Sequence, residues 1–468
     1  MTIQTHLLKL TKDEFFYSFK QQTVDEIYTT FLESGRGGNY SIAAWNPFAI
    51  AKSVENGIEI TWENGKKEVR VGESLKLIEE LTQQYKTITN DALPDFQGGA
   101  IGFISYDYAR EIERLPNVAK DELAVPNLYF YLFKEWAVHN VHTDEVTLMK
   151  LPASELDLAA WSTTWQTAAA VGLSKRLFEV GQAVDVVNDE RELKISFSNE
   201  QFQQAVKKIQ AYISAGDVFQ VNLSVQQAKQ LDATPLTMYE AVRSFNPSPY
   251  MSYISSDAFS IVSGSPELLI KRKNKELSTR PIAGTRPRGK TEAEDIVLAN
   301  ELIENVKERA EHVMLVDLER NDLGRVSKYG TVEVNEFMVI ERYSHVMHIV
   351  SNVRGEVADD KTNTDVIRAM FPGGTITGAP KIRTMEIIEE LEPVRRGIYT
   401  GSIGWIGYDG NMEMNIVIRT AFIQEGIAYI QAGAGVVIDS IPENEFVESL
   451  NKAKAMWQAK AMAEVATQ

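Results

Sequence analysis

Apolar and polar positions alternate with a period of two over much of residues 1–150, which is the pattern of strands with one buried face. Turn signals separate these stretches, and the Asn56-Gly57 dipeptide is typical of a tight hairpin. The same alternation returns over residues 399–440, where Asp409-Gly410 and Glu425-Gly426 predict two more turns. We expect this last stretch to form one antiparallel meander.

A period of 3.6 residues marks the helical segments. Residues 199–215 carry an apolar stripe, with Ser198 and Gly216 at the ends as favoured capping residues. Residues 298–322 are predicted as one helix, and a terminal helix is expected after a capping box at 440–443. Strands interleaved with long helices predict an α+β fold in which helices cover sheets.

The pattern divides the chain into three parts. Residues 1–150 form a strand-rich N-terminal region, residues 151–195 an Ala-rich and then charged connector, and residues 196–460 the interleaved region. With 468 residues, of which 44% are hydrophobic, the chain can bury a large core.

Composition argues against several functions. The formal net charge is -17 and no basic run offsets it, so neither nucleic acid nor an anionic membrane is expected as a partner. We find no secretory signal pattern and no apolar stretch long enough to span a membrane, which predicts a cytoplasmic protein. The lack of cysteine removes thiol nucleophiles, and the 6 histidines show no zinc-ligand spacing.

Two glutamate pairs have the spacing that places both carboxylates on one helix face. Glu308 and Glu311 form the first pair, Glu445 and Glu448 the second, and Lys452 follows one turn later. If the two helices meet, four carboxylates would converge and require a hard cation such as Mg²⁺. The alternative is two solvated helix faces, with Glu448 and Lys452 forming an ion pair worth roughly a few tenths of a kcal/mol.

Other candidates combine backbone access with a charged or polar side chain. Gly433 and Gly435 leave room for a ligand carboxylate to reach backbone amides, and Arg419 on the preceding strand suits the same group. Close sheet packing is the alternative for these glycines. Glu267, at the start of a strand, could be desolvated and act as a general acid. His348 lies in an apolar run, where a histidine is more often a hydrogen-bonded core residue than a catalyst.

A series of segments in order resembles the chorismate-utilising enzymes, the family of anthranilate synthase component I, aminodeoxychorismate synthase component I, isochorismate synthase and salicylate synthase. The segments include GSPELL (264–269), RPIAGTRPRG (280–289), PGGTITGAPK (372–381), NIVIRT (415–420) and QAGAGVVIDS (431–440). FLES (31–34) and GGAIGFISYD (98–107) extend the resemblance to the N-terminal region, which looks like that of anthranilate synthase component I. The resemblance implies two large antiparallel β-sheets packed as a sandwich with outer helices, and a chorismate site between them.

The resemblance also implies roles for individual residues. Glu311 and Glu448 would be Mg²⁺ ligands, with Glu308 and Glu445 ligating the ion or its water, and Glu267 would protonate the departing hydroxyl. The residues implied to bind chorismate are Gln220, Ala283, Gly284, Thr285, Tyr399, Arg419, Gly433 and Gly435. Those implied to act beside the ring, together with Glu267, are His348, Thr375 and Lys452.

Gln220 occupies the position at which isochorismate and salicylate synthases resemble one another in carrying a lysine that activates water. Its presence favours ammonia as the nucleophile. A glutaminase of this class would need a cysteine, which the chain lacks, so a separate glutamine amidotransferase subunit is implied.

Two amine products remain open. Many aminodeoxychorismate synthases carry a lysine where this chain has Ala283, as anthranilate synthases do. Asn222, Arg280 and the segment 95–110 instead resemble alanine-bearing aminodeoxychorismate synthases. We therefore favour 4-amino-4-deoxychorismate, for 4-aminobenzoate and folate synthesis, over anthranilate plus pyruvate. A regulator that binds chorismate or tryptophan without turnover is the hypothesis from another class.

FLES and NPSPYM also resemble the segments that hold feedback tryptophan in anthranilate synthases. Glu33, Ser34, Tyr250 and Met251 could therefore form a tryptophan pocket. The alternative is a packed interface between the N-terminal and catalytic sheets.

Overall fold

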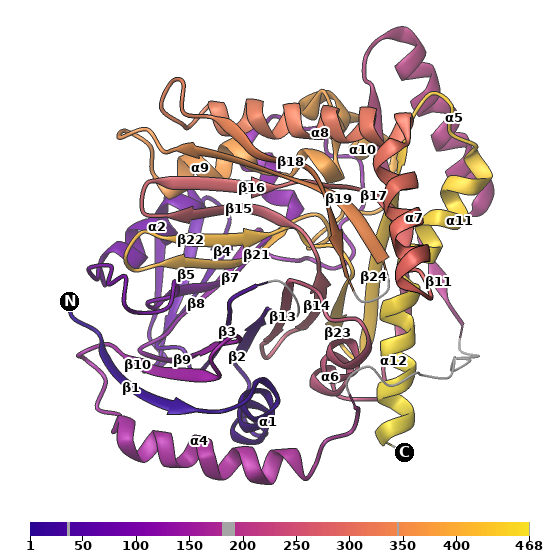
Figure 1. Cartoon of the computed structure of the whole chain (residues 1–468). Coiled ribbons are helices and arrows are strands. Elements are labelled where there is room, and N and C mark those ends of the chain that lie inside the picture. Colours follow the sequence, from indigo (N-terminus) through magenta and orange to yellow (C-terminus); the bar gives the residue numbers. More distant parts are fainter. Residues whose placement is uncertain (35–37, 180–191, 344–345, 468) are drawn as a thin grey trace.

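Strands with an apolar face pair edge to edge into two antiparallel sheets, and helices cover the outside (Figure 1). The computed structural model describes residues 1–34, 38–179, 192–343 and 346–467. The first sheet has the order β1 (Gln4–Lys9), β10 (Glu145–Lys150), β9 (Glu135–Asn140), β3 (Tyr40–Trp45), β2 (Thr29–Glu33), β13 (Tyr250–Ser255), β14 (Ser260–Ser265), β23 (Thr420–Gln424), β24 (Ile427–Val436), β12 (Gln220–Gln230) and β11 (Lys194–Ile195), with β20 (Gly378–Ala379) also on β12.

The second sheet has the order β17 (Ile282–Pro287), β19 (Val346–Glu356), β16 (Glu276–Arg280), β15 (Leu268–Lys273), β22 (Met412–Asn415), β21 (Ser402–Gly407), β7 (Gly99–Ile104), β8 (Leu128–Leu132), β4 (Ala49–Val54), β5 (Gly57–Trp62) and β6 (Lys67–Val71), with β18 (Glu333–Arg342) on β19. The α+β class with two large antiparallel sheets and outer helices is confirmed.

The helices lie around the two sheets. Figure 1 shows α8, α9 and α10 at the top, α1 and α4 at the bottom, and α5, α11 and α12 along the right. The helices are α1 (Lys12–Gln22), α2 (Ser74–Gln83), α3 (Ala109–Ile112), α4 (Leu158–Leu173), α5 (Asn199–Ala215), α6 (Pro235–Phe245), α7 (Glu292–Glu304), α8 (Val306–Gly324), α9 (Asn363–Met370), α10 (Lys381–Leu391), α11 (Pro442–Lys452) and α12 (Lys454–Thr467), with short 3₁₀ turns η1 (Tyr106–Tyr108) and η2 (Gly374–Ile376). Within the described residues, no helix has both the length and the apolar character needed to span a membrane.

Both sheets contain strands from the N-terminal region and from the region after residue 195. In the first sheet β2 pairs with β13, and in the second β7 pairs with β21. The expected connector at 151–195 contains α4, which packs on α1, while residues 180–191 lie outside the described part of the chain.

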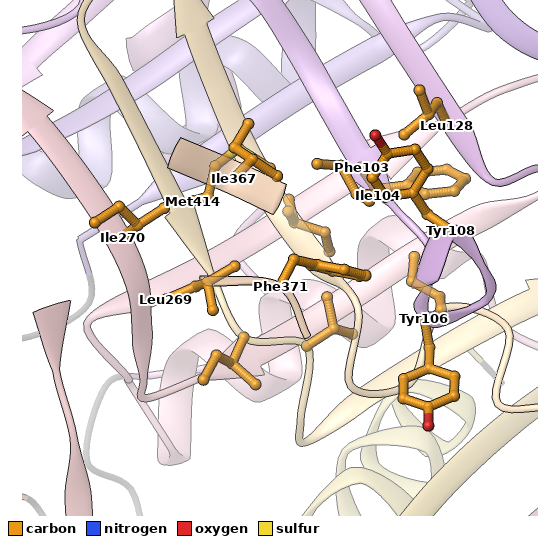
Figure 2. Packing of buried hydrophobic residues seen from close by; sticks show 14 of the residues in the cluster. Phe103, Ile104, Tyr106, Tyr108, Leu128, Leu269, Ile270, Ile367, Phe371 and Met414 are labelled. Carbon is orange, nitrogen blue, oxygen red and sulfur yellow. The ribbon is translucent and has the colours of Figure 1, made fainter. Parts of the chain in front are cut away.

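The main apolar core holds side chains from both sheets and from the helices above the second one. Figure 2 shows part of it, where Phe103 and Ile104 of β7, Leu269 of β15 and Met414 of β22 lie around Phe371, just after α9. A second core lies between the first sheet and α1, α4, α6 and α12.

Several local predictions are confirmed. Ser198 caps α5 by accepting a hydrogen bond from Gln201 N, and Gly216 ends it with a φ of 84°. Asn56 adopts a φ of 62° in the turn between β4 and β5, the left-handed conformation that such a turn requires.

The predicted helix at 298–322 is wrong as a single element. It is two helices, α7 and α8, because Asn305 leaves the helical conformation and its side chain accepts a hydrogen bond from Glu308 N at 3.0 Å. The predicted capping box at 440–443 is also wrong. Ser440 Oγ accepts from Val437 N at 3.0 Å, and α11 begins at Pro442 without a side-chain cap.

The predicted meander at 399–440 is divided between the sheets. Its two hairpins form, but β21 and β22 belong to the second sheet whereas β23 and β24 belong to the first. The chain crosses just before Thr420, and it crosses in the opposite direction at Pro266-Glu267 between β14 and β15. The crossings bind each other, since Ile416 N donates to Glu267 O at 2.9 Å and Gly264 N to Arg419 O at 3.0 Å.

Candidate active site

A cavity of about 230 Å³ lies beside the paired crossings, where both sheets contribute to its wall. The predicted residues that line it are Glu267, Ala283, Gly284, Thr285, His348, Thr375, Tyr399, Arg419, Gly433 and Lys452. They come from widely separated positions in the sequence, so the tertiary structure brings most of the predicted catalytic and substrate-binding residues together.

Glu267 presents a buried carboxyl to this cavity. Burial raises its pKa to about 7, although the neighbouring Thr375 hydroxyl, the Ile282 backbone and Arg419 each favour the charged form. The side chain is 5% exposed, and its Oε1 makes no hydrogen bond of good geometry to Thr375 or to any other described residue. A carboxyl that is partly protonated near neutral pH can deliver a proton to a bound ligand.

Arg419 lies at the second crossing, one residue before β23, with a φ of 51°. Burial lowers the pKa of its guanidinium while Tyr343 and Glu267 oppose that shift, and the group stays charged. No residue that the structure describes forms a hydrogen bond or ion pair with this guanidinium. An unpaired cation in a cavity wall is suited to bidentate binding of a carboxylate.

His348 lines the cavity as a neutral imidazole, because burial lowers its pKa to about 4. Its Nδ1 lies 2.9 Å from Gly284 O and 3.1 Å from Thr285 Oγ1. Since a carbonyl oxygen can only accept, we assign the hydrogen to Nδ1 and leave Nε2 as an acceptor.

Glycines make room for polar groups around the cavity. Gly284 has a φ of 64°, and a Cβ there would lie 3.0 Å from Glu308 Oε2. A Cβ on Gly433 would lie 2.6 Å from Asn222 Oδ1, so only glycine allows that side chain to lean across the strand. The Gly433 backbone N–H favours the charged form of the Tyr399 phenol, but burial is the larger effect and raises the pKa, which keeps the phenol neutral.

Gln220 and Gly435 lie outside the cavity wall, near its edge. Gln220 Nε2 donates to Glu311 Oε1 at 3.4 Å, and a Cβ on Gly435 would lie 2.3 Å from the same nitrogen. The predicted substrate-binding residue Gln220 thus contacts the first glutamate pair.

The two glutamate pairs lie on α8 and α11 with cationic neighbours. Glu308 Oε1 is 3.2 Å from Arg286 Nη1, and Glu448 Oε1 is 2.9 Å from Lys452 Nζ. The part of the chain that is described contains no group of three or more His, Cys, Asp or Glu side chains placed to hold a metal ion. The structure therefore does not gather the four carboxylates into one closed cluster.

The donor chemistry of the pairs nevertheless fits a hard cation. Burial raises the pKa of Glu311, and repulsion from Glu308 adds to the effect. Burial also raises the pKa of Glu445, with a further contribution from Glu448. Lys452 lowers the pKa of both Glu311 and Glu445, which indicates that the two pairs share a neighbourhood. A divalent cation would relieve the repulsion within each pair.

A second, smaller cavity of about 40 Å³ is lined by Glu33, Ser34, Tyr250 and Met251. The Glu33 carboxylate is already bound, by Arg243 Nε at 2.9 Å and by the Tyr239 hydroxyl at 3.0 Å. This volume accommodates a few water molecules, so a tryptophan would require the surrounding side chains to move.

Asn222 and Gln431 also line the main cavity, and neither is among the residues predicted to form the site. The signal that could have found them is the strand period of two. Gln431 shares one face of β24 with Gly433 and Gly435, and Asn222 lies opposite Gly435 on β12.

Comparisons with known proteins agree with this geometry. A family model described as chorismate binding enzyme matches residues 29–458. Aminodeoxychorismate synthase component 1 of Bacillus subtilis (strain 168) is 49% identical over 462 residues, which cover 97% of this chain and 96% of that protein. Anthranilate synthase component 1 of Acetivibrio thermocellus is 41% identical over 451 residues, covering 92% and 89%.

A solved structure is similar over most of its length. The crystal structure of anthranilate synthase component I from Streptococcus pneumoniae TIGR4 has a TM-score of 0.76 and 33% identity, covering 90% of this chain and 92% of that one. Together with the cavity between the sheets, these matches show that the chain is an enzyme of the chorismate-binding family.

Proposed function

We propose that the protein aminates chorismate to 4-amino-4-deoxychorismate in a Mg²⁺-dependent reaction, with ammonia supplied by a separate glutamine amidotransferase subunit. The product would serve 4-aminobenzoate and folate synthesis. The observation that carries the proposal is the cavity that joins the unpaired guanidinium of Arg419 to the buried carboxyl of Glu267. The guanidinium suits a substrate carboxylate, and the carboxyl suits protonation of a departing hydroxyl.

Glu267 would act as the general acid. With a pKa of about 7 it is protonated in a substantial fraction of molecules at neutral pH. Its proton would pass to the C4 hydroxyl oxygen, so that the C–O bond breaks and water leaves. A C–N bond to ammonia forms in exchange, and the new amine passes its extra proton to the Glu267 carboxylate, which restores the acid. The neutral His348 offers Nε2 as an acceptor beside the ring.

The two carboxylates of chorismate would be held at different places. Arg419 would bind one of them on the cavity wall. Lys452, whose Nζ donates to Gly433 O at 2.9 Å, would contribute positive charge for the other. Mg²⁺ held by Glu311 and Glu448, with Glu308 and Glu445 beside them, would supply further positive charge for the ring carboxylate.

Ammonia would reach the ring directly. Ala283 lines the cavity, so the chain offers no lysine at that position to form a covalent adduct. Gln220 cannot act as a base for water in the way a lysine would. Because the chain contains no cysteine, it cannot supply the thiolate of a glutaminase, and the ammonia source would be a second subunit.

The choice of product rests on similarity. The 49% identical relative from Bacillus subtilis is named aminodeoxychorismate synthase component 1, which supports amination at C4. Ala283 and the relatives named anthranilate synthase component 1 support the alternative, in which anthranilate and pyruvate form.

Product analysis tests the proposal. The purified protein would be incubated with chorismate, Mg²⁺ and ammonium salt at alkaline pH. We expect a product that yields 4-aminobenzoate only after an aminodeoxychorismate lyase is added. Direct appearance of anthranilate and pyruvate would establish the alternative, and unchanged chorismate would favour a binding protein without turnover.

A further inference from the structure

A buried ion pair lies behind the cavity wall. Arg396 Nε donates to Glu392 Oε2 at 3.0 Å and its Nη2 to Glu392 Oε1 at 2.8 Å, which is the bidentate geometry of a strong pair. The two side chains are 1% and 2% exposed, and neither lines the cavity.

The remaining N–H groups of Arg396 bind parts of the wall. Nη1 donates to Ile376 O at 3.0 Å and to Thr400 Oγ1 at 3.2 Å, while Nη2 donates to Asn222 O at 2.7 Å. All five donors of the guanidinium are therefore used. Its Cζ also lies 4.9 Å from the ring centroid of Tyr106, whose ring points away from the other labelled side chains in Figure 2. Ile376 and Asn222 both line the cavity, so the ion pair fixes two of its segments from behind.

The pair also sets the direction of a hydrogen-bond chain. The Glu392 carboxylate can only accept, and it accepts from Ser224 N at 2.8 Å and from Ser224 Oγ at 2.7 Å. The Ser224 hydroxyl has then donated its only hydrogen. Its oxygen can therefore only accept a further hydrogen bond, and it accepts one from Gln431 Nε2 at 2.9 Å.

This chain fixes the orientation of the Gln431 amide. Its nitrogen faces Ser224, so its carbonyl oxygen is the free end. Gln431 is 6% exposed and lines the cavity, and its Oε1 has no hydrogen-bond partner among the described residues. A buried carbonyl oxygen without a partner is unfavourable, and a bound donor would satisfy it.

We propose that Gln431 Oε1 accepts a hydrogen bond from a substrate donor group, and that Ser224, Glu392 and Arg396 are positioning residues that hold it in that role. This inference rests on the proposed function, because the donors would be a ring hydroxyl of chorismate or an N–H of ammonia. A carboxylate has no hydrogen to donate at neutral pH, so Gln431 repels the group that Arg419 attracts. The wall would thereby orient the substrate from two sides.

Steady-state kinetics on Gln431→Met tests the contact. Methionine keeps the length of the side chain but removes the acceptor. We expect KM to rise about tenfold for the substrate that supplies the donor, with little change for the other. A higher KM for chorismate identifies the ring hydroxyl, and a higher KM for ammonium identifies ammonia. Unchanged values for both substrates would overturn the proposal.

Gln227→Met is the matched control. Gln227 is also a buried glutamine of the first sheet, and its Oε1 accepts from Trp457 Nε1 at 2.8 Å, but it does not line the cavity. We expect this variant to lose thermal stability with unchanged KM values. A KM change equal to that of Gln431→Met would assign the effect to sheet damage and refute the contact.

The relay is tested by Ser224→Ala alone and combined with Gln431→Met. If Ser224 acts through Gln431, the single variant raises the same KM and the double variant equals Gln431→Met. Independent effects that simply add would overturn the positioning role.

Arg396→Lys extends this test, with Arg110→Lys as control because Arg110 pairs with Glu389 of α10 without contacting the cavity. We expect KM to change only in Arg396→Lys. Equal changes in both variants would overturn the role of Arg396.

The wild-type protein in the same assay tests the proposed function separately. If it consumes no chorismate, that function fails, and calorimetric titration of chorismate into the variants still measures the Gln431 contact.

Discussion

The buried charges of the cavity wall differ from Glu308 and Glu448 of the glutamate pairs in how they are compensated. Glu267 and Arg419 lie where the chain crosses between the sheets, and burial leaves the carboxyl with a pKa of about 7 and the guanidinium without a described partner. Glu308 and Glu448 lie on helices at the edge of the site, and each has a cationic partner. Burial makes Glu267 and Arg419 reactive, whereas Glu308 and Glu448 are paired and accessible to ions.

This difference separates two contributions to the proposed reaction. The wall residues depend on the exclusion of water and on a fixed backbone, because both crossings bind each other through main-chain hydrogen bonds. The glutamates of α8 and α11 would depend on a bound cation such as Mg²⁺. Changes in the wall should therefore act through protonation or through binding of a substrate carboxylate, and changes in the glutamates of α8 or α11 should act through the concentration of Mg²⁺.

The largest effect is expected for Glu267→Gln, which keeps the shape but removes the acidic proton. We expect kcat to fall by about 10²–10⁴-fold, the usual contribution of a positioned general acid. Glu319→Gln is the matched control, since burial also raises the pKa of Glu319, to about 8, but this residue does not line the cavity. Initial rates of chorismate loss measure both variants, and a comparable loss in the control would remove the special role of Glu267.

The same substitution should alter the pH dependence of stability. Burial raises the Glu267 pKa from 4.5 to about 7, so the folded state binds more protons than the unfolded state between these values. The free energy of unfolding contributed by this group therefore falls as pH rises through that window and remains lower above it. Across this window the contribution of Glu267 to the free energy of unfolding changes by on the order of 3 kcal/mol at most, and Glu267→Gln removes that change. Melting curves from pH 5 to 8 should diverge between wild type and Glu267→Gln, and parallel curves would contradict the burial argument.

Glu311→Gln should weaken the response to Mg²⁺. We expect about 100-fold lower activity at limiting Mg²⁺, because one anionic oxygen donor is lost. An independent readout is the rise in melting temperature with added Mg²⁺, which should shrink in the variant. Glu304→Gln, on the exposed end of α7, should behave as wild type. Full activity and an unchanged Mg²⁺ response in Glu311→Gln would refute the metal assignment.

A smaller effect is expected for Arg419→Lys. Lysine keeps the positive charge but loses the bidentate geometry, so KM for chorismate should rise about tenfold with a modest change in kcat. The rise should be the same at limiting and saturating Mg²⁺, which distinguishes the wall from the helices. A KM that changes only at low Mg²⁺ would show that the cavity wall and the glutamates of α8 and α11 act as one site.

Much of the site could be predicted before the fold was known. The backbone access at Gly433 and the resemblance of several segments led to residues that do surround one cavity, whereas the glutamates found by their spacing do not line it. Asn222 and Gln431 were harder to find, because an amide on a strand carries no chemical signature until its neighbours are known. The helical period over residues 298–322 does not show the break between α7 and α8 at Asn305. A single residue that favours capping is a weaker signal than the helical period on both sides of it.

The sequence by itself determined the types of elements, the lack of a nucleophilic thiol and the family of the protein, because periodicity, composition and motifs are local properties. Only the tertiary structure decided that the apparent meander at 399–440 is shared between two sheets. That division places Arg419 beside Glu267 and also buries the carboxyl. Burial raises the pKa of Glu267 against the opposing effect of Arg419, and both effects depend on contacts between residues that are distant in the chain.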